Sequence, residues 1–218
     1  MSTYLVTGAN RGIGLELCRC LQARGETVIA VCRQNSPKLA NLGVKVVTGI
    51  DVGSDAAVAS LANNLQGVTI DVLINNAGML ATDSLENLNF EGMRRQFEIN
   101  SLGPLRVTAA LLPQIPPGGK VAIITSRMGS IADNTSGGYY GYRMSKAAAN
   151  MVGMSLARDL KSRQIAVAVL HPGLVNTGMT NTGIPPAQAA AGLIARIDEL
   201  NLDNTGTFWH GNGEILPW

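Results

Sequence analysis

The chain has 218 residues, of which 46% are apolar types, and a formal net charge of +2 at pH 7. This length suffices for one globular domain with a sizeable core, and we expect a single domain spanning residues 1–218. Lys and Arg form no runs, which argues against a nucleic-acid-binding face, because binding to backbone phosphates requires clustered cations. We therefore expect small-molecule partners and no nucleic acid.

No apolar stretch approaches the roughly 20 residues of a membrane-spanning helix, and the first residues lack the regions of a signal peptide. We expect no membrane span and a cytoplasmic location. The three cysteines, Cys18, Cys20 and Cys32, are too few and too close to the N-terminus to staple a domain, so we expect reduced thiols. With only His171 and His210 in addition, we expect no metal site.

Short apolar runs rich in β-branched residues alternate with amphipathic segments. Strands are expected at 4–6, 27–31, 44–47, 70–74, 120–125, 165–170 and 207–209. Helices are expected near 12–24, 54–65, 89–112, 142–162 and 186–199. This alternation is typical of βαβ units, and near-continuous apolar strands indicate a sheet covered on both faces. We predict a three-layer α/β fold with a Rossmann-type, doubly wound parallel sheet of about seven strands, whose ligands bind beyond the carboxyl ends of the strands.

A glycine-rich loop follows the first expected strand. Residues 7–14 read TGANRGIG and space their glycines as Gly8-x-x-x-Gly12-x-Gly14. Strand, glycine loop and helix in this order direct the N–H groups of a helix N-terminus at a pyrophosphate. The spacing differs from the G-x-G-x-x-G fingerprint, because Leu17 stands where the third glycine would fall. A plain tight turn is the alternative.

The end of the second expected strand favours NADP(H) over NAD(H). An acidic residue about 20 residues beyond the glycine loop would bind the ribose 2′-hydroxyl of NAD, whereas this chain has Cys32-Arg33-Gln34. Arg33 and Arg11 can flank a 2′-phosphate through charge-assisted hydrogen bonds; two solvated surface arginines are the alternative. Asp51 can accept a hydrogen bond from the adenine amino group or can simply cap a turn.

A tyrosine and a lysine lie four residues apart in YYGYRMSK, residues 139–146. Tyr142 and Lys146 share one face of the expected helix. A phenol with a pKa near ~10 holds its proton too tightly for transfer at neutral pH, and lowering that pKa to ~7 requires roughly 4 kcal/mol. A cation about 4 Å away supplies about 4 kcal/mol only where the effective dielectric constant is near ~20. The pair therefore requires shelter from water; an ordinary exposed pair is the alternative.

Several motifs occur together in one order: TGANRGIG, NNAG at 75–78, Asn100, Ser126, Tyr142-x-x-x-Lys146 and Pro172-Gly173. In this combination the chain resembles the short-chain dehydrogenase/reductase family over nearly its whole length. The stretch 126–150 and the ending GEILPW are similar to the branch of that family that holds the bacterial C-signal protein (C-factor) and carbonyl-reductase-like proteins.

The resemblance implies an NADP(H)-dependent oxidoreductase that interconverts a carbonyl and an alcohol by hydride transfer. Tyr142 would act as the general acid or base, and Ser126 would hydrogen-bond the substrate oxygen. Lys146 would bind the nicotinamide ribose and lower the pKa of the phenol, while Asn100 would hold a water that links the lysine to solvent. From the residues alone, Ser126 can instead bond its own backbone, and Asn100 can merely interrupt its helix.

We expect cofactor contacts from a wider set of residues at the carboxyl ends of the strands. These are Gly8, Asn10, Arg11, Gly12, Ile13, Gly14, Arg33, Asp51, Val52, Asn75, Ala77, Gly78, Tyr142, Lys146, Pro172, Gly173, Val175 and Thr177. Pro172-Gly173 taken alone is an ordinary turn. We interpret His171 beside it as a satisfied structural imidazole.

Two departures from the family pattern bear on the substrate pocket. Ser126 and Tyr142 are sixteen positions apart, a few more than is usual, so we expect the irregular stretch 127–141, the longest of the chain, to bulge. The segment GMTNTGIPPAQ, which follows Thr177, is short for a substrate lid, so we expect an open or shallow pocket. The apolar residues expected on its wall indicate an apolar aldehyde or ketone; they are Met128, Ile131, Met179 and Ile184.

Other functions stay open at this point. Resemblance to the C-signal protein permits a signalling or regulatory protein that binds NAD(P) with or without turnover, and a family epimerase or dehydratase is a third option. Segments 89–112 and 142–162 look like the two dimer-forming helices of the family, so we expect a homodimer or a homotetramer. Arg94, Arg95 and Glu98 are interpreted as interface ion pairs or as solvated charges.

Overall fold

A computed structural model describes residues 1–178 and 180–218 and places seven strands in one parallel sheet. The strand order is β3-β2-β1-β4-β5-β6-β7, with every neighbouring pair parallel. The strands are β1 (Thr3–Thr7), β2 (Thr27–Val31), β3 (Lys45–Val47), β4 (Val72–Asn75), β5 (Lys120–Ile124), β6 (Ala166–His171) and β7 (Phe208–His210). The predicted fold class is confirmed.

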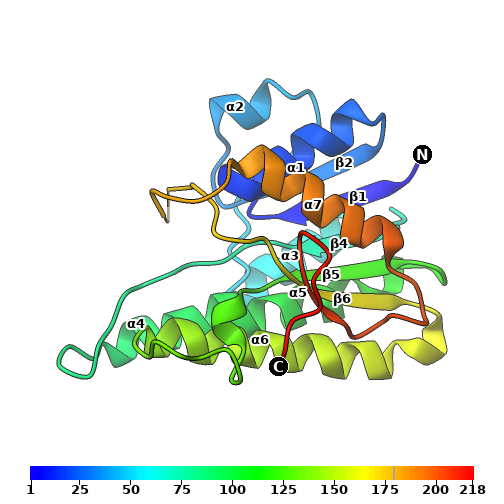
Figure 1. The fold of residues 1–218 in the computed structure, drawn as a ribbon. Coiled ribbons are helices and arrows are strands. Elements are labelled where there is room, and N and C mark those ends of the chain that lie inside the picture. The colour runs from blue at the N-terminus through cyan, green and yellow to red at the C-terminus, as the bar shows by residue number, and fades with distance from the viewer. Residues whose placement is uncertain (179) are drawn as a thin grey trace.

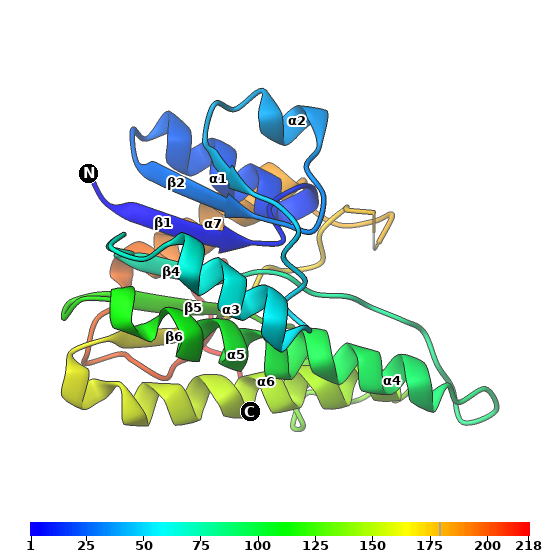
Figure 2. The same cartoon turned by 180° about the vertical axis from the view of Figure 1, so that it is seen from behind.

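Helices cover both faces of the sheet. They are α1 (Gly12–Ala23), α2 (Pro37–Ala40), α3 (Asp55–Asn64), α4 (Phe90–Phe97), α5 (Gly103–Leu111), α6 (Tyr140–Asp159) and α7 (Pro186–Glu199). Helices α1 and α7 lie on one face, and α3, α5 and α6 lie on the other (Figures 1 and 2). The short helix α2 was not predicted, and α6 begins two residues before the expected start.

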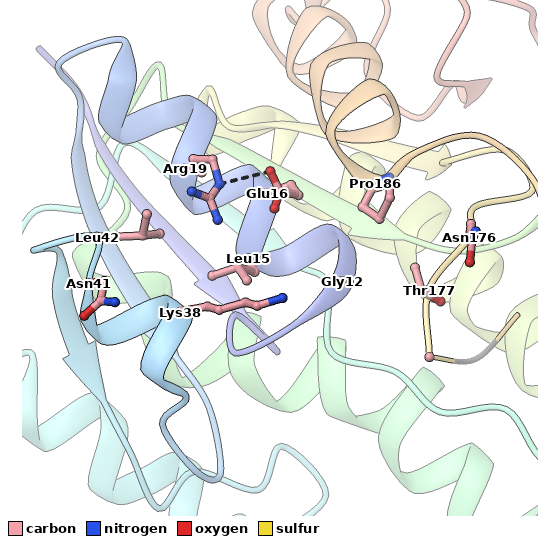
Figure 3. A pocket seen from close by; sticks show the side chains of 11 residues that line it. Gly12, Leu15, Glu16, Arg19, Lys38, Asn41, Leu42, Asn176, Thr177 and Pro186 are labelled. Atoms are coloured by element: carbon pink, nitrogen blue, oxygen red, sulfur yellow. Dashed lines mark hydrogen bonds and ion pairs between the residues drawn. The ribbon is translucent and has the colours of Figure 1, made fainter. Parts of the chain in front are cut away.

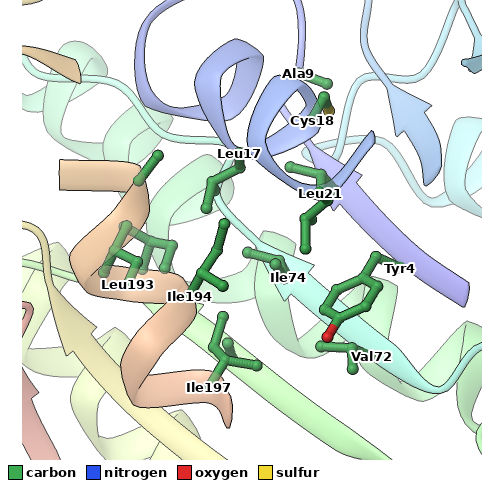
Figure 4. Close-up of a cluster of buried hydrophobic side chains, with 14 of the residues drawn as sticks. Tyr4, Ala9, Leu17, Cys18, Leu21, Val72, Ile74, Leu193, Ile194 and Ile197 are labelled. Carbon is green, nitrogen blue, oxygen red and sulfur yellow. The ribbon is translucent and has the colours of Figure 1, made fainter. Parts of the chain in front are cut away.

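The core consists of two apolar layers, one on each face of the sheet. Successive residues of β1 alternate between them: Tyr4 and Val6 belong to the cluster beneath α1 and α7, and Leu5 belongs to the cluster beneath α3, α5 and α6. This alternation follows from the period of two along a strand. Figure 4 shows the first cluster, where Leu193 of α7 and Leu17 of α1 meet above β4.

The expected helix 89–112 is divided. Helix α4 passes into a π-helical turn, η1 (Glu98–Leu102), before α5 begins. Such turns insert one extra residue into a helix and occur often at functional sites. The stretch 127–141 is not the longest irregular piece, because a 3₁₀ turn, η3 (Arg127–Gly129), and the start of α6 leave 130–139 irregular, whereas 76–89 holds neither helix nor strand.

The three cysteines of the chain are free, as expected for reduced thiols. Within residues 1–178 and 180–218, no helix combines the length and the apolar character that crossing a bilayer demands.

Leu193 of α7 is fully buried in the apolar cluster that α1 and α7 cover, so shortening its side chain should destabilise the fold. We expect Leu193→Ala to lower the free energy of unfolding by about 2–5 kcal/mol through lost burial and a residual cavity. Urea denaturation followed by circular dichroism measures this change. The matched control is Leu85→Ala, because Leu85 is 68% exposed; its effect should stay within about 0.5 kcal/mol. Equal effects of the two changes would contradict the assignment of this core.

Candidate active site

The glycine loop connects β1 to α1 with a backbone that only small residues permit. Gly8 and Gly12 have φ values of +67° and +54°, in the left-handed region that favours glycine. A Cβ at Gly8 would lie 2.8 Å from the Cα of Ala77, and a Cβ at Gly14 would overlap the Gly8 carbonyl oxygen. The loop therefore packs directly against the segment that follows β4.

The N-terminus of α1 carries neither a side-chain cap bond among the described residues nor an acidic residue in its first turn. The first N–H groups of a helix have no partners within the helix, and in α1 they lie at the positive end of the helix dipole. An anionic group such as a pyrophosphate fits this end of the helix.

A cavity of about 520 Å³ lies along the carboxyl edge of the sheet. Its volume is in the range of cofactor sites. It brings together these predicted cofactor residues: Gly8, Asn10, Arg11, Gly12, Ile13, Gly14, Arg33, Asp51, Val52, Ala77, Gly78, Tyr142, Lys146, Pro172 and Thr177. The sequence reasoning missed these lining residues: Cys32, Ile50, Asn76, Met79, Arg95, Ile99, Ile124, Thr125 and Gly178.

Three predicted cofactor residues do not line this cavity: Asn75, Gly173 and Val175. Asn75 is buried and donates through Nδ2 to Thr108 Oγ1 of α5 at 3.0 Å. The next residue, Asn76, faces the glycine loop and donates to the carbonyl oxygen of Thr7 at 3.0 Å. Neighbouring side chains point in opposite directions along a strand, so Asn75 is buried while Asn76 faces the glycine loop.

Gly173 and Val175 have structural surroundings. Gly173 adopts a φ of +88°, and a Cβ there would lie 3.5 Å from the His210 ring. Val175 is 5% exposed and pairs with Ile184 through an isolated bridge. Both residues shape the segment that leads to Thr177 rather than the cavity wall.

Cations border the cavity at the end that holds the glycine loop. Arg11 and Arg33 are exposed lining residues, and within the described part of the chain neither belongs to an ion pair. Asp51 caps a turn, as one alternative from the sequence held, because it accepts from Gly53 N at 2.9 Å. It also lines the cavity, and its contact with the adenine amino group stays a prediction. Its other oxygen accepts from Arg95 at 2.5 Å. Burial opposes ionisation, but these two donors hold the pKa of Asp51 below its ordinary value.

Tyr142 and Lys146 line the other end of the cavity, whereas the predicted catalytic residues Ser126 and Asn100 lie behind its wall and do not line it. The Nζ atom of Lys146 lies 5.8 Å from the centre of the Tyr142 ring and donates to the carbonyl oxygen of Ile124 at 3.0 Å. Ser126 accepts from Met128 N at 3.2 Å, and its hydroxyl is near enough to Tyr142 to lower the pKa of the phenol. Ser126 thus bonds its own backbone and also lies beside the tyrosine.

Burial shifts the pKa values of Tyr142 and Lys146. Burial raises the pKa of the Tyr142 phenol, and the Ser126 hydroxyl offsets only part of that effect. Burial also lowers the pKa of Lys146 to about 8. Without a bound dinucleotide, burial and Ser126 set the pKa of the phenol. The lowering of that pKa by Lys146 in the sheltered, cofactor-bound site stays a prediction.

Asn100 lies in the π-helical turn and is buried. Its Oδ1 accepts from Met79 N at 2.8 Å, and its Nδ2 donates to the carbonyl oxygen of Met79 at 2.8 Å and to Ser145 Oγ at 3.0 Å. A Cβ at Gly78 would lie 3.3 Å from Asn100 Oδ1 and 3.7 Å from Lys146 Nζ. Asn100 therefore both interrupts its helix and approaches the lysine.

His171 is not the satisfied imidazole that we expected. Its Nδ1 is buried and has no hydrogen-bond partner among the described residues. Its ring meets that of His210 edge to face, with centroids 4.9 Å apart. Burial, followed by the nearby His210, Arg127 and Lys146, lowers the pKa of His171 to about 3. The imidazole is therefore neutral at physiological pH.

The substrate side is less defined. Met128, Ile131 and Ile184 do not line the cavity, and Met179 lies outside the described residues. A neighbouring hollow of about 540 Å³ shares Gly12, Thr177 and Gly178 with the cavity and continues along the outer side of α1 (Figure 3). In the portion of the chain that the structure describes, no three His, Cys, Asp or Glu residues form a group that could hold a metal ion.

Comparisons with known proteins show the family and the fold. A family model described as short chain dehydrogenase matches residues 2–186. The chain is 46% identical, over the full length of both proteins, to the 1-hydroxy-2-glutathionyl-2-methyl-3-butene dehydrogenase of Rhodococcus sp. strain AD45. It is 43% identical to the C-signal protein of Myxococcus xanthus over 73% of this chain and 99% of that protein. The NADPH-bound carbonyl reductase from chicken fatty liver superposes with a TM-score of 0.89 at 28% identity, covering 100% of this chain and 99% of the other.

The buried Lys146 predicts a measurable pH dependence of stability. Its pKa falls from 10.5 in the unfolded chain to about 8 in the fold, which corresponds to roughly 3 kcal/mol of charge-burial cost at neutral pH. We expect Lys146→Met to raise the free energy of unfolding at pH 7 by about 2 kcal/mol, after the loss of about 1 kcal/mol for the bond to Ile124.

The sign follows from proton binding. Below pH 8 the ammonium is charged in both states and the burial cost is complete; between about 8 and 10.5 the folded lysine loses its proton first, so the advantage of the variant should disappear. Chemical denaturation between pH 7 and pH 10.5 measures this. The control is the exposed Lys161→Met, expected to stay within about 0.5 kcal/mol. A constant difference across this pH range would contradict the burial of a charged lysine.

Proposed function

The chain belongs to the short-chain dehydrogenase family, and from this we propose that it interconverts a carbonyl and an alcohol with NADP(H) as the hydride carrier. The observation that carries the proposal is the pair Tyr142 and Lys146 at one end of a cavity whose other end is the glycine loop, with Ser126 beside the tyrosine. The start of α1 and the two exposed arginines that border the cavity, for which residues 1–178 and 180–218 provide neither a side-chain cap nor an ion pair, fit a phosphorylated dinucleotide.

The residues at the reacting end have distinct tasks. The nicotinamide, when bound, supplies or accepts the hydride. Tyr142 donates its phenolic proton to the carbonyl oxygen during reduction, and Ser126 donates a hydrogen bond to the same oxygen. Because burial raises the pKa of Tyr142, the phenol of the free protein carries its proton at neutral pH, which is the form that reduction requires. The Lys146 ammonium stabilises the phenolate that proton donation leaves behind.

Asn100 and Lys146 approach the same glycine, Gly78, which supports a shared path for proton replacement. In this proposal Lys146 also holds the nicotinamide ribose, and Asn100 positions the solvent-side partner of the lysine. The buried, fully hydrogen-bonded amide of Asn100 can do this without moving, because Met79 and Ser145 fix its orientation.

The arginines support NADP(H) over NAD(H). A 2′-phosphate beside Arg33 and Arg11 would form charge-assisted hydrogen bonds, and no carboxylate occupies the position after β2 that would bind a free ribose hydroxyl. The carbonyl reductase from chicken fatty liver binds NADPH, which supports the same choice here.

The substrate class rests on the relatives. The similar Rhodococcus enzyme is a dehydrogenase of a hydroxyl compound that carries a glutathionyl group, so primary alcohols with a thioether-linked peptide join simple aldehydes and ketones as candidate substrates. The sequence proposed an apolar carbonyl compound from Met128, Ile131, Met179 and Ile184, and none of the described three lines the cavity. An apolar substrate is still proposed, because other residues, Met79, Ile99 and Ile124, give the cavity apolar walls.

A signalling role is the second candidate, because the chain is 43% identical to the C-signal protein of Myxococcus xanthus. The two functions separate in one test: a Tyr142→Phe protein that fully replaces the natural protein in its own host would show that the cellular role does not depend on turnover.

A homodimer is also part of the proposal. Exposed apolar side chains lie on α5 and α6 in the two segments expected to pair: Leu105, Met144 and Met151. Of the charges that the sequence assigned to interface ion pairs or to solvent, Arg95 pairs with Asp51 and Glu98 with Arg106 within the chain, and Arg94 is exposed.

Removing the Tyr142 hydroxyl should stop the chemistry and leave cofactor binding intact. We expect Tyr142→Phe to lower kcat for carbonyl reduction by about 10²–10⁴-fold, the range typical of a lost general acid. NADPH absorbance measures turnover, and fluorescence titration should give a Kd for NADPH within about 2-fold of the natural value, roughly 0.4 kcal/mol. Tyr140→Phe is the control, because Tyr140 does not line the cavity. Undiminished turnover by Tyr142→Phe would refute the proposed role.

Removing the Arg33 guanidinium should reduce the preference for NADPH. A hydrogen bond to a charged group contributes about 1.5–3 kcal/mol, so we expect Arg33→Gln to lower the ratio of kcat/KM for NADPH to that for NADH by about 10–100-fold. Steady-state kinetics with each cofactor measures the ratio. Arg94→Gln, an exposed position outside the cavity, should leave it unchanged. An unchanged ratio in Arg33→Gln would place the 2′-phosphate elsewhere.

A further inference from the structure

The helix that carries Tyr142 begins in an unusual way. Its N-cap residue, Tyr139, makes no side-chain cap bond within the described ranges and adopts a left-handed φ of +51°. Gly137 and Gly138 before it are also left-handed, with φ values of +62° and +64°. A tyrosine in this conformation is disfavoured by contact between its Cβ and the backbone, so neighbouring structure must hold it.

Asp83, from the loop between β4 and α4, supplies the missing cap. Its backbone oxygen accepts from Tyr139 N at 3.1 Å. Its Oδ1 accepts from Tyr140 N at 2.5 Å, and its Oδ2 accepts from Gly141 N at 3.0 Å. Three successive N–H groups thus point at one residue, as in anion-binding turns. The carboxylate also lies at the positive end of the α6 dipole.

The loop that carries Asp83 is itself fixed by buried side chains of the adjoining helix. Gln96 Oε1 accepts from Ala81 N at 3.1 Å, and Asn100 bonds both the N–H and the carbonyl oxygen of Met79. Met79 lines the cavity. The segment 79–83 therefore connects the cavity wall to the first turn of α6 through a chain of short hydrogen bonds.

The first turn of α6 packs closely against this loop and against α4. A Cβ at Gly141 would lie 2.6 Å from Gln96 Nε2, 2.7 Å from Met93 Cγ and 3.1 Å from Asp83 Oδ2. Gly141 immediately precedes Tyr142 in the chain. A shift of this turn would consequently move the phenol relative to Ser126 and Lys146.

Arg143 fixes the same turn from the other side. Its Nε donates to the carbonyl oxygens of Gly138 at 3.1 Å and Gly137 at 3.3 Å, and its Nη2 donates to Ser136 Oγ at 2.8 Å. The left-handed stretch is held at its carbonyls by Arg143 and at its following N–H groups by Asp83. The bulge expected between Ser126 and Tyr142 is thus tied down at its end nearest the tyrosine.

We propose that Asp83 is a positioning residue for Tyr142, acting through the N–H groups of residues 139–141 that it caps. This inference rests on the proposed function and deepens it, because it assigns the placement of the proton donor to a residue outside the motif that contains the donor. Displacing a reacting group by about 1 Å can cost on the order of 10²-fold in rate, so loss of this cap should appear in turnover more than in cofactor binding.

The test compares Asp83→Ala and Asp83→Asn with the control Glu86→Gln, a change to an exposed carboxylate in the same loop. We expect Asp83→Ala to lower kcat for carbonyl reduction by about 10–100-fold while the Kd for NADPH stays within about 2-fold. Asp83→Asn keeps one acceptor oxygen for one of the two side-chain bonds, so its kcat should lie between those of Asp83→Ala and the natural protein. Glu86→Gln should change neither quantity.

A primary isotope effect with 4-deuterated NADPH separates positioning from general loss of structure. Misplacement of Tyr142 slows the chemical step, so the isotope effect on kcat should rise in Asp83→Ala, whereas a smaller folded fraction would leave it unchanged. If Asp83→Ala does not fold, Asp83→Asn carries the same comparison.

Two outcomes would overturn the inference: a kcat for both Asp83 variants within 2-fold of the natural value, roughly 0.4 kcal/mol, or a lower kcat with an unchanged isotope effect. These are distinguishable from failure of the proposed function. If Tyr142→Phe is inactive while the Asp83 variants turn over normally, only the role of Asp83 fails. If Tyr142→Phe is itself fully active, the proposed function fails.

Discussion

The burial of the Lys146 ammonium beside the Tyr142 phenol is the constraint on which the rest of this site depends. Removing both groups from water raises the pKa of the phenol and lowers that of the amine, so each is held closer to its neutral form than it would be in solvent. The fold tolerates this because the carbonyl oxygen of Ile124 accepts from the ammonium. Burial of the charged lysine lowers the stability of the fold at the position where the proposed mechanism transfers a proton.

The parallel sheet makes this arrangement possible. The residues after β1, β4, β5 and β6 are far apart in sequence, yet all reach the same edge because their strands run in one direction. The glycines of the first loop have a second role in this packing, since they let that loop lie against Ala77 and Asn76. The cavity is consequently bounded by backbone at one end and by a tyrosine and a lysine at the other.

The sequence predicted the sheet and most helices, because strand and helix periodicity depends on local chemistry. Most of the cavity wall came from the resemblance of the ordered motifs to the short-chain dehydrogenase family. The sequence did not distinguish Asn75 from Asn76, since the position of the strand end decides which side chain faces the cavity. It also gave no signal for Asp83, whose bonds to the start of α6 join segments that are close only in the folded chain. It could not give the direction of the pKa shift of Tyr142 in the protein without cofactor, because the extent of desolvation depends on the complete surroundings.

The π-helical turn between α4 and α5 has a consequence for how this protein can change over evolutionary time. Each residue of a helix turns the chain by roughly 100°, so deleting one residue from 98–102 would restore a regular helix and swing Asn100 away from Met79 and Ser145. Substitutions on the outer surface of that segment leave its phase intact, whereas a single-codon deletion does not. We therefore expect residues 98–102 to accept substitutions at outward-facing positions but no change in length.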